Sequence, residues 1–204
     1  MKKHFEKVAV LGAGVMGAQI AALLANMNVP VILFELATDE TDKNTLSKQA
    51  IKRLTKLKPA PFATGSVQHA IETANYDDDL LKLKECDLII EAIAENMDWK
   101  KDLYDKINDF IKDDAILATN TSGLSINQLA EILPDDKREQ FLGIHFFNPP
   151  RYMHLVELIP CATTKLEHVN SLEEFLVTSL GKGVVIAKDT PNFIANRIGV
   201  FNLI

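Results

Sequence analysis

Two residues in the second half of the chain have the chemistry to move a proton at a bound substrate. His145 lies in the apolar stretch "FLGIHFFNPP" (141–150), and Glu157 follows in "HLVELIP" (154–160). If these stretches are strands that pair across "NPPRYM", the carboxylate reaches one imidazole nitrogen and orients the ring. The other nitrogen is then free to take a proton from a substrate hydroxyl. The alternative is that His145 only packs among aromatic side chains.

A second group of residues, near the N-terminus, is typical of a dinucleotide site. The stretch "GAGVMG" follows an apolar run at 8–11, opens a helix of small residues, and fits G-x-G-x-x-G with Gly12, Gly14 and Gly17. These glycines allow a tight turn, close approach of backbone to a pyrophosphate, and packing of helix on strand. Backbone amides at the helix start, around Val15 and Met16, then face the phosphates. The competing interpretation is a glycine turn that serves packing alone.

Glu35 indicates which dinucleotide would bind. It ends the next apolar stretch, "VPVILFE", 23 positions after Gly12. A carboxylate there accepts hydrogen bonds from the adenosine ribose hydroxyls and repels a 2′-phosphate, and no Arg or Lys occurs between Glu35 and Lys43. This predicts NAD rather than NADP. The alternative is a solvated carboxylate at a strand end.

The elements that must position these residues alternate along the chain, which predicts a doubly wound α/β domain with a mostly parallel Rossmann-type sheet. Expected strands cover 8–11, 29–35, 87–95, 115–122, 141–147, 154–160 and 183–188. Expected helices cover 18–27, a basic excursion at 41–58, 96–111, 125–133 with Ser125 as cap, and 171–182 stopped at Gly181. The segment 66–86 carries mixed signals.

The last helix is expected to begin with Thr190 as cap and Pro191 in its first turn. It shows no stop signal. We therefore expect an NAD-binding domain at 1–188, followed at 189–204 by the start of an all-helical C-terminal domain that is mostly absent from this chain.

Composition narrows the classes of partner. The net charge is -6, which argues against nucleic acid or an anionic membrane as the main partner. Only two cysteines, Cys86 and Cys161, are present, and no metal-type Cys/His spacing appears. The basic start is a poor signal peptide, and no apolar run is long enough to span a bilayer. We expect a cytoplasmic protein without a bound metal.

The motifs together resemble a known family. "GAGVMGAQIA", "EAIAEN", "NTSGLSI", "HFFNPPRYMHLVE" and "KDTPNFIANRI" are similar to stretches of the L-3-hydroxyacyl-CoA dehydrogenases of fatty-acid β-oxidation, in order and across the whole chain. The "HFFNP…LVE" segment is the most specific. The resemblance implies NAD-dependent oxidation of a (3S)-3-hydroxyacyl-CoA, with His145 as general base and Glu157 as the carboxylate that orients it.

The resemblance also implies contacts around the cofactor. Ser122 matches a residue at the join of substrate and nicotinamide, and Asn148 one that seats cofactor and substrate. Asn120 is a further predicted cofactor contact, and Glu95 and Lys100 match positions near the NAD ribose and nicotinamide side. Each has a plain alternative: Asn120 and Ser122 could close a turn, Glu95 could cap the next helix, and Lys100 could be an exposed helical lysine.

On the substrate side, Asn196 resembles a contact at the start of the second domain. Lys52 and Lys56 lie in the basic helix, where the family carries a coenzyme A contact, although such a charge run is usually a solvated face. Arg151 departs from many family members and resembles longer bacterial chains joined to an enoyl-CoA hydratase; it would hold a CoA phosphate or form a surface salt bridge.

Two other functions stay open. One is an NAD-binding module that is inactive without the missing helical domain, through which the family usually forms its homodimer. We accordingly expect this fragment to bind NADH but to turn over poorly. The other is a different Rossmann β-hydroxyacid dehydrogenase, for which a lysine-centred site would be expected.

Overall fold

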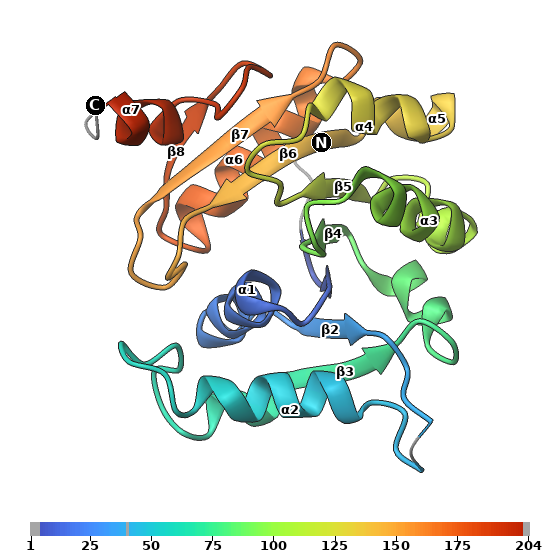
Figure 1. Cartoon of the computed structure of the whole chain (residues 1–204), viewed down its shortest axis with the longest axis vertical. Coiled ribbons are helices and arrows are strands. Elements are labelled where there is room, and N and C mark those ends of the chain that lie inside the picture. The colour runs from blue at the N-terminus through green and yellow to red at the C-terminus, as the bar shows by residue number, and fades with distance from the viewer. Residues whose placement is uncertain (1–4, 40, 202–204) are drawn as a thin grey trace.

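The strands form one mixed sheet in the order β3-β2-β1-β4-β5-β6-β7-β8 in the computed structural model, which describes residues 5–39 and 41–201 (Figure 1). Neighbouring strands pair in parallel, except that β6 and β7 are antiparallel. The strands are β1 (Val8–Leu11), β2 (Val31–Glu35), β3 (Ile71–Asn75), β4 (Leu88–Glu91), β5 (Ile116–Thr119), β6 (Phe141–Phe146), β7 (Leu155–Pro160) and β8 (Gly183–Ile186).

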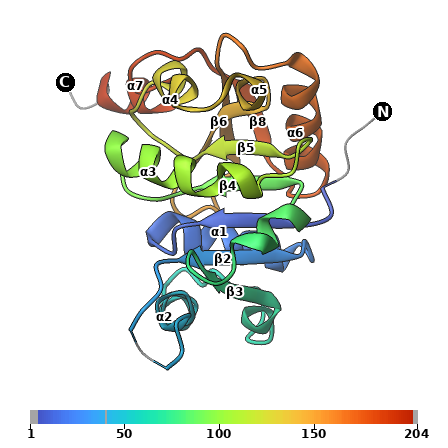
Figure 2. The same cartoon turned by 90° about the vertical axis from the view of Figure 1, so that its right-hand side faces the viewer.

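Helices cover both faces of this sheet, and each face has its own apolar core. Helices α1, α2 and α6 pack into one core, and α3 and α4 into the other. Figure 2 shows the strands stacked in order, with α2 near β3 at one end and α6 near β8 at the other. The helices are α1 (Val15–Asn26), α2 (Thr45–Leu54), α3 (Met97–Ile107), α4 (Ile126–Ile132), α5 (Asp135–Arg138), α6 (Leu166–Thr178) and α7 (Ala195–Phe201), with 3-10 turns at Val67–Ala70, Leu80–Glu85 and Asn108–Phe110.

The buried strands have the sequences that a doubly covered sheet requires. Strands β1, β4, β5 and β6 are buried at every position, which is why they read as continuous apolar runs. The order reverses between β1 and β4, since β2 and β3 lie on one side of β1 while β4 and β5 lie on the other. In open α/β sheets, ligands bind at the carboxyl ends of the strands beside such a reversal.

The predicted fold class is confirmed, and the differences concern element ends. Strand β4 stops at Glu91, earlier than expected, because the Glu91 side chain accepts a hydrogen bond from the Ile93 amide (2.8 Å) and the chain turns. Strand β3 lies inside the segment with mixed signals. Helix α6 begins at Leu166, before the predicted start.

The prediction that the last helix starts at Pro191 is wrong. Asn192 and Phe193 have φ of 62° and 47°, which a right-handed helix cannot contain, so α7 begins at Ala195. Ser125 caps α4 as predicted, since its side chain accepts from the Gln128 amide. Among the described residues, none of the helices is long and apolar enough to cross a bilayer.

Candidate active site

Two adjoining cavities open at the carboxyl ends of the central strands, where the strand order reverses. The first, of about 590 Å³, is lined by residues of the glycine turn, the turn after β4 and the ends of β5 and β6, together with Asn196 of α7. The second, of about 470 Å³, lies between the glycine turn, Glu35 and α3. Gly14, Ala92, Ile93 and Ala94 line both cavities. A long ligand could therefore cross from one cavity to the other over the glycine turn.

The three glycines of the turn differ in the space around them. There is room for a ligand beside one of them, whereas the other two are in close contact with backbone atoms. A Cβ on Gly17 would lie 1.9 Å from the Gly12 carbonyl oxygen, so α1 packs on the turn only with glycine there. Gly12 has φ +99°, and a Cβ would lie 2.9 Å from the Ala92 oxygen. At Gly14 nothing lies within 4 Å of the added Cβ. This is the cradle that backbone-to-pyrophosphate contact requires.

Glu35 is tied to the glycine turn on the wall of the second cavity. Its Oε2 accepts from the Ala13 amide (2.7 Å) and its Oε1 from the Leu36 amide (2.9 Å). Tyr76 and Trp99 line the same cavity. The Tyr76 side chain is almost fully buried, and its pKa is raised chiefly by burial and further by the charge of Glu35. The cavity thus has a carboxylate on its wall that is suited to the hydroxyls of a sugar.

His145 and Glu157 are paired by the antiparallel register of β6 and β7. The His145 Nδ1 lies 2.8 Å from Glu157 Oε2, and the Glu157 side chain is fully buried. Within the part of the chain that the structure describes, no hydrogen bond involves the other ring nitrogen, Nε2. The rings of Phe147 and Phe193 lie 4.4 and 5.7 Å from the imidazole, centroid to centroid. Because His145 lines the first cavity, a bound molecule there can exchange a proton with it.

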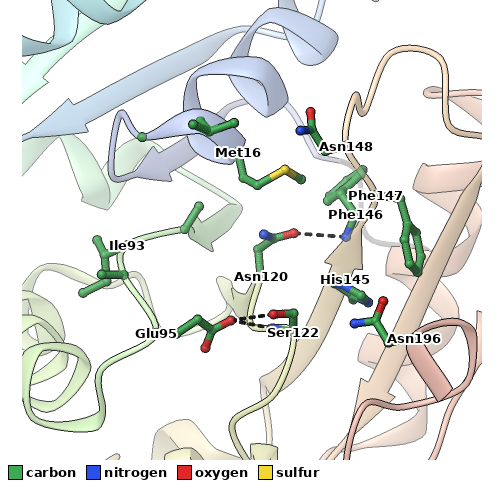
Figure 3. Close-up of a pocket in the computed structure, with 14 residues that line it drawn as sticks. Met16, Ile93, Glu95, Asn120, Ser122, His145, Phe146, Phe147, Asn148 and Asn196 are labelled. Carbon is green, nitrogen blue, oxygen red and sulfur yellow. Dashed lines mark hydrogen bonds between the residues drawn. The ribbon is translucent and has the colours of Figure 1, made fainter. Parts of the chain in front are cut away.

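Asn120, Ser122 and Glu95 also line this cavity, and Figure 3 shows Glu95 pointing toward Ser122 and Asn120 pointing toward Phe146. Asn120 Oδ1 accepts from the Phe146 amide (3.0 Å). Glu95 accepts from the Ser122 amide (2.6 Å), the Ser122 hydroxyl (3.1 Å) and the Thr121 hydroxyl (2.6 Å). Glu95 is therefore not the cap of α3; the Asn96 side chain takes that position by accepting from the Trp99 amide.

Asn148 is held by a residue that sequence reasoning missed. Its Oδ1 accepts from Gln19 Nε2 (2.9 Å), which also donates to the Val15 carbonyl (3.0 Å). Gln19 is buried on α1, and a glutamine on the apolar face of a predicted helix was the available signal. Asn196 lines the same cavity as His145 and Asn148, so the structure brings the predicted substrate-side residue to the site.

Lys100 is not brought to either cavity. It is fully buried on α3, and its Nζ lies 2.6 and 2.7 Å from the two oxygens of Glu91, which is also fully buried. The hydroxyls of Tyr104 and Thr119 donate to the same carboxylate (3.0 and 2.6 Å). Burial, followed by the Glu91 charge, raises the pKa of Tyr104 well above its usual value. This cluster sits under the turn that lines both cavities.

The basic residues of the excursion also lie outside the two cavities. Lys52 and Lys56 are exposed on and just after α2. Among the described residues Arg151 forms no salt bridge: its guanidinium donates to the carbonyls of Ala60 (2.7 Å) and Phe62 (2.8 Å). It joins the β6–β7 connection to the loop after α2.

These features define a Rossmann-type dinucleotide-binding domain with a histidine–carboxylate pair beside the cofactor cleft. The family described as "3-hydroxyacyl-CoA dehydrogenase, NAD binding domain" matches residues 7–190. The chain belongs to this family, and the prediction of NAD as cofactor is confirmed.

Individual relatives agree with this assignment. A probable 3-hydroxyacyl-CoA dehydrogenase of Deinococcus radiodurans is 46% identical, over 98% of this chain and 58% of the relative. A putative fatty acid oxidation complex trifunctional enzyme of Rickettsia felis is 45% identical, over 100% of this chain and 28% of the relative. The crystal structure of (S)-3-hydroxybutyryl-CoA dehydrogenase from Ralstonia eutropha matches with a TM-score of 0.78 and 32% identity, over 96% of this chain and 68% of that one. The chain thus spans 58% of the length of the first of these two curated relatives and 28% of the length of the second.

Proposed function

We propose that the protein containing this chain oxidises (3S)-3-hydroxyacyl-CoA to 3-oxoacyl-CoA with NAD, as a step of fatty-acid β-oxidation. The observation that carries the proposal is the His145–Glu157 pair on the wall of a cavity that continues over Gly14. The names of the relatives support the substrate class.

The buried pair suits His145 to be the general base. A carboxylate only accepts hydrogen bonds, so Glu157 Oε2 holds Nδ1 as the donor and leaves the Nε2 lone pair toward the cavity. Nε2 takes the proton of the C3 hydroxyl, and Glu157 stabilises the imidazolium that forms. Bound NAD supplies the acceptor for the hydride that leaves C3.

The two asparagines of the cavity are suited to bind carbonyl oxygens. The side-chain oxygen of Asn120 is taken by the Phe146 amide and that of Asn148 by Gln19. Each asparagine therefore keeps its NH₂ group for an acceptor, such as a carboxamide or thioester oxygen. Ser122 is fixed by Glu95 at the same wall, and its position suits the join of substrate and cofactor. Holding the reacting groups in line lowers the barrier through orientation.

The remaining predicted contacts divide between cofactor and substrate. Glu35 would hold the adenosine ribose, and the turn of Gly12, Gly14 and Gly17, with the amides of Val15 and Met16, would hold the pyrophosphate. Lys100 would act through Glu91 and the turn above it. Asn196 would contact the acyl-CoA, and the exposed Lys52 and Lys56 would contact phosphates of coenzyme A outside the cavities.

The test is a comparison of thioester and free acid with the full-length protein. NADH oxidation is followed with acetoacetyl-CoA and, at equal concentration, with free acetoacetate. We expect turnover of the order of 1–10³ per second with the thioester and little with the free acid. Comparable rates with both would instead favour a dehydrogenase of free β-hydroxy acids, and binding of NADH without turnover of either would favour a module that only binds NAD.

A further inference from the structure

The carboxylate that holds His145 has a second set of partners. Glu157 Oε2 contacts His145 Nδ1, while Glu157 Oε1 accepts from the amides of Ile194 (3.0 Å) and Ala195 (2.9 Å). These are the last residue before α7 and the first residue of α7. One fully buried carboxyl group therefore joins β7 to the general base and to a helix start more than thirty residues later.

Helix α7 depends on this acceptor because its own sequence supplies none. The first amides of a helix need acceptors from outside the helix, and the usual acceptor is the side-chain oxygen of a Ser, Thr, Asp or Asn just before it. Here that position is Ile194, which has no polar side-chain atom. A negative charge at this end also suits the helix dipole. Glu157 thus does for α7 what a local capping residue would otherwise do.

The segment that leads into α7 is held at both of its ends: Asp189 accepts hydrogen bonds from α4, and the amides of Ile194 and Ala195 donate to Glu157. Asn192 and Phe193 adopt positive φ, a strained conformation for residues with a Cβ. Before them, the Asp189 carboxylate accepts from the amides of Ile126 (3.1 Å) and Asn127 (2.9 Å) at the start of α4. Burial favours a raised pKa for Asp189, but these hydrogen bonds and those from the Ser125 and Asn127 side chains outweigh it, and the pKa is lowered.

The same segment contacts the imidazole directly. The buried ring of Phe193 packs edge-on against His145 at 5.7 Å, and Asn196, one residue after Ala195, lines the cavity with His145. A shift of α7 would change the hydrogen bonds on Glu157, the packing of the imidazole and the position of Asn196 together. Errors of about 1 Å in such positions can lower rates by about a hundredfold.

We propose that the start of α7 is a positioning element for the proton transfer: through Glu157, the amides of Ile194 and Ala195 set the orientation of His145, so that the general base and the substrate-side helix move as one unit. The inference rests on the proposed function for its kinetic consequence. It makes Ile194 and Ala195 positioning residues, since they act on His145 only through Glu157.

The first experiment removes one amide donor with proline in the full-length protein. Proline fits the first position of a helix and has no N–H, so Ala195→Pro deletes one hydrogen bond to Glu157 while α7 can still form. With acetoacetyl-CoA and NADH, we expect kcat to fall about tenfold, with the KM for the thioester and the Kd for NADH within about twofold. The control is Ile198→Gly, which loosens α7 at an exposed position and leaves both amides intact; its kcat should stay within about twofold of the parent.

The outcomes separate positioning from mere stability. Equal kcat in Ala195→Pro and the parent overturns the proposal. So does a fall in kcat that Ile198→Gly reproduces, or one that comes with a matching loss of NADH affinity. If the parent protein does not turn over the thioester at all, the proposed function fails, and the coupling is then judged by the second experiment alone.

The second experiment needs no activity. Glu157→Gln keeps an oxygen for the α7 amides but places an NH₂ group toward His145, whereas Glu157→Ala keeps neither partner. We expect the amides of Ile194 and Ala195 to exchange with deuterium at least tenfold faster in the alanine variant than in the glutamine variant. The imidazole Nδ1–H resonance of His145 should shift in both variants and also in Ala195→Pro. Equal exchange in the two Glu157 variants, or an unmoved resonance in Ala195→Pro, overturns the coupling.

Discussion

The chemistry of single residues in this site depends on which of their polar atoms already form hydrogen bonds within the protein. The sequence predicts a role for His145 because an imidazole with a carboxylate on the next strand is suited to proton transfer. The register of β6 and β7 supports that pairing, with Glu157 opposite His145. The roles of Asn120 and Asn148 could not be predicted in this way. Their NH₂ groups are free for a ligand only because the Phe146 amide and Gln19 donate to their side-chain oxygens, and the sequence does not show these partners.

Lys100 and Arg151 show why side-chain environment could not be read from sequence. A lysine on a predicted amphipathic helix reads as exposed or as a ligand contact. Here it is fully buried because Glu91, on the neighbouring strand, is also fully buried and needs a counter-charge. Arg151 donates to two backbone carbonyls about ninety residues earlier in the chain, and a local sequence pattern cannot predict so distant a partner.

A substitution of Glu35 tests whether this single carboxylate selects NAD over NADP. Glu35→Gln removes the charge but keeps an oxygen for one of its two backbone partners, the Ala13 and Leu36 amides. Without the repulsion of a 2′-phosphate, the preference for NADH over NADPH should narrow by about tenfold. Titration of both cofactors measures it, with Asp136→Ala, an exposed carboxylate on α5, as the control. An unchanged ratio of the two dissociation constants would remove Glu35 from cofactor selection.

At the scale of elements, apolar runs were the reliable signal and element ends were not. Strands β1, β2, β4 and β5 are apolar because both of their faces are covered, and a buried run is visible in sequence. Strand β3, at the sheet edge, mixes polar and apolar residues, so the sequence pattern does not predict a strand there. The predicted start of α7 is wrong because Asn192 and Phe193 adopt positive φ although neither is a glycine, so the sequence gives no sign of the break.

The glycine turn gives a prediction in which two substitutions fail for different reasons. In Gly17→Ala, the new Cβ would lie 1.9 Å from the Gly12 oxygen, so α1 must move; we expect both a clearly lowered Tm and lost NADH binding. In Gly14→Ala, nothing lies within 4 Å, so Tm should change little while NADH binds at least tenfold more weakly.

Thermal unfolding and NADH titration of both variants separate these effects. Gly65→Ala, at another open position, is the control that should change neither quantity. Unweakened NADH binding by Gly14→Ala would show that the turn serves packing alone, which is the competing interpretation of the motif.

At the scale of the whole molecule, the site exists because the sheet reverses its order beside β1. The glycine turn, the turn after β4 and the end of β6 come from distant parts of the chain and meet at one edge of the sheet. The sequence predicted the fold class, and fold class implies this meeting point. It did not predict that Glu157 would also hold α7, since that contact depends on how the chain returns after β8.

The family assignment and the geometry address different questions. The match over residues 7–190 places the chain among NAD-binding domains of 3-hydroxyacyl-CoA dehydrogenases. The buried pair of His145 and Glu157 is the geometry on which we base the proposal that an alcohol loses its proton in this cleft. Activity of the whole protein remains our proposal, because the chain spans 58% of one curated relative and 28% of another.

The most direct measurement is the turnover of His145→Gln in the full-length protein, together with its dissociation constant for NADH. Glutamine cannot accept the proton, so we expect kcat with acetoacetyl-CoA to fall by about 10²–10⁴-fold while NADH affinity stays within about twofold. His69→Gln, at an exposed position, is the matched control and should behave as the parent. Turnover of His145→Gln equal to that of the parent, or NADH binding lost together with turnover, would contradict the assignment of His145 as the general base.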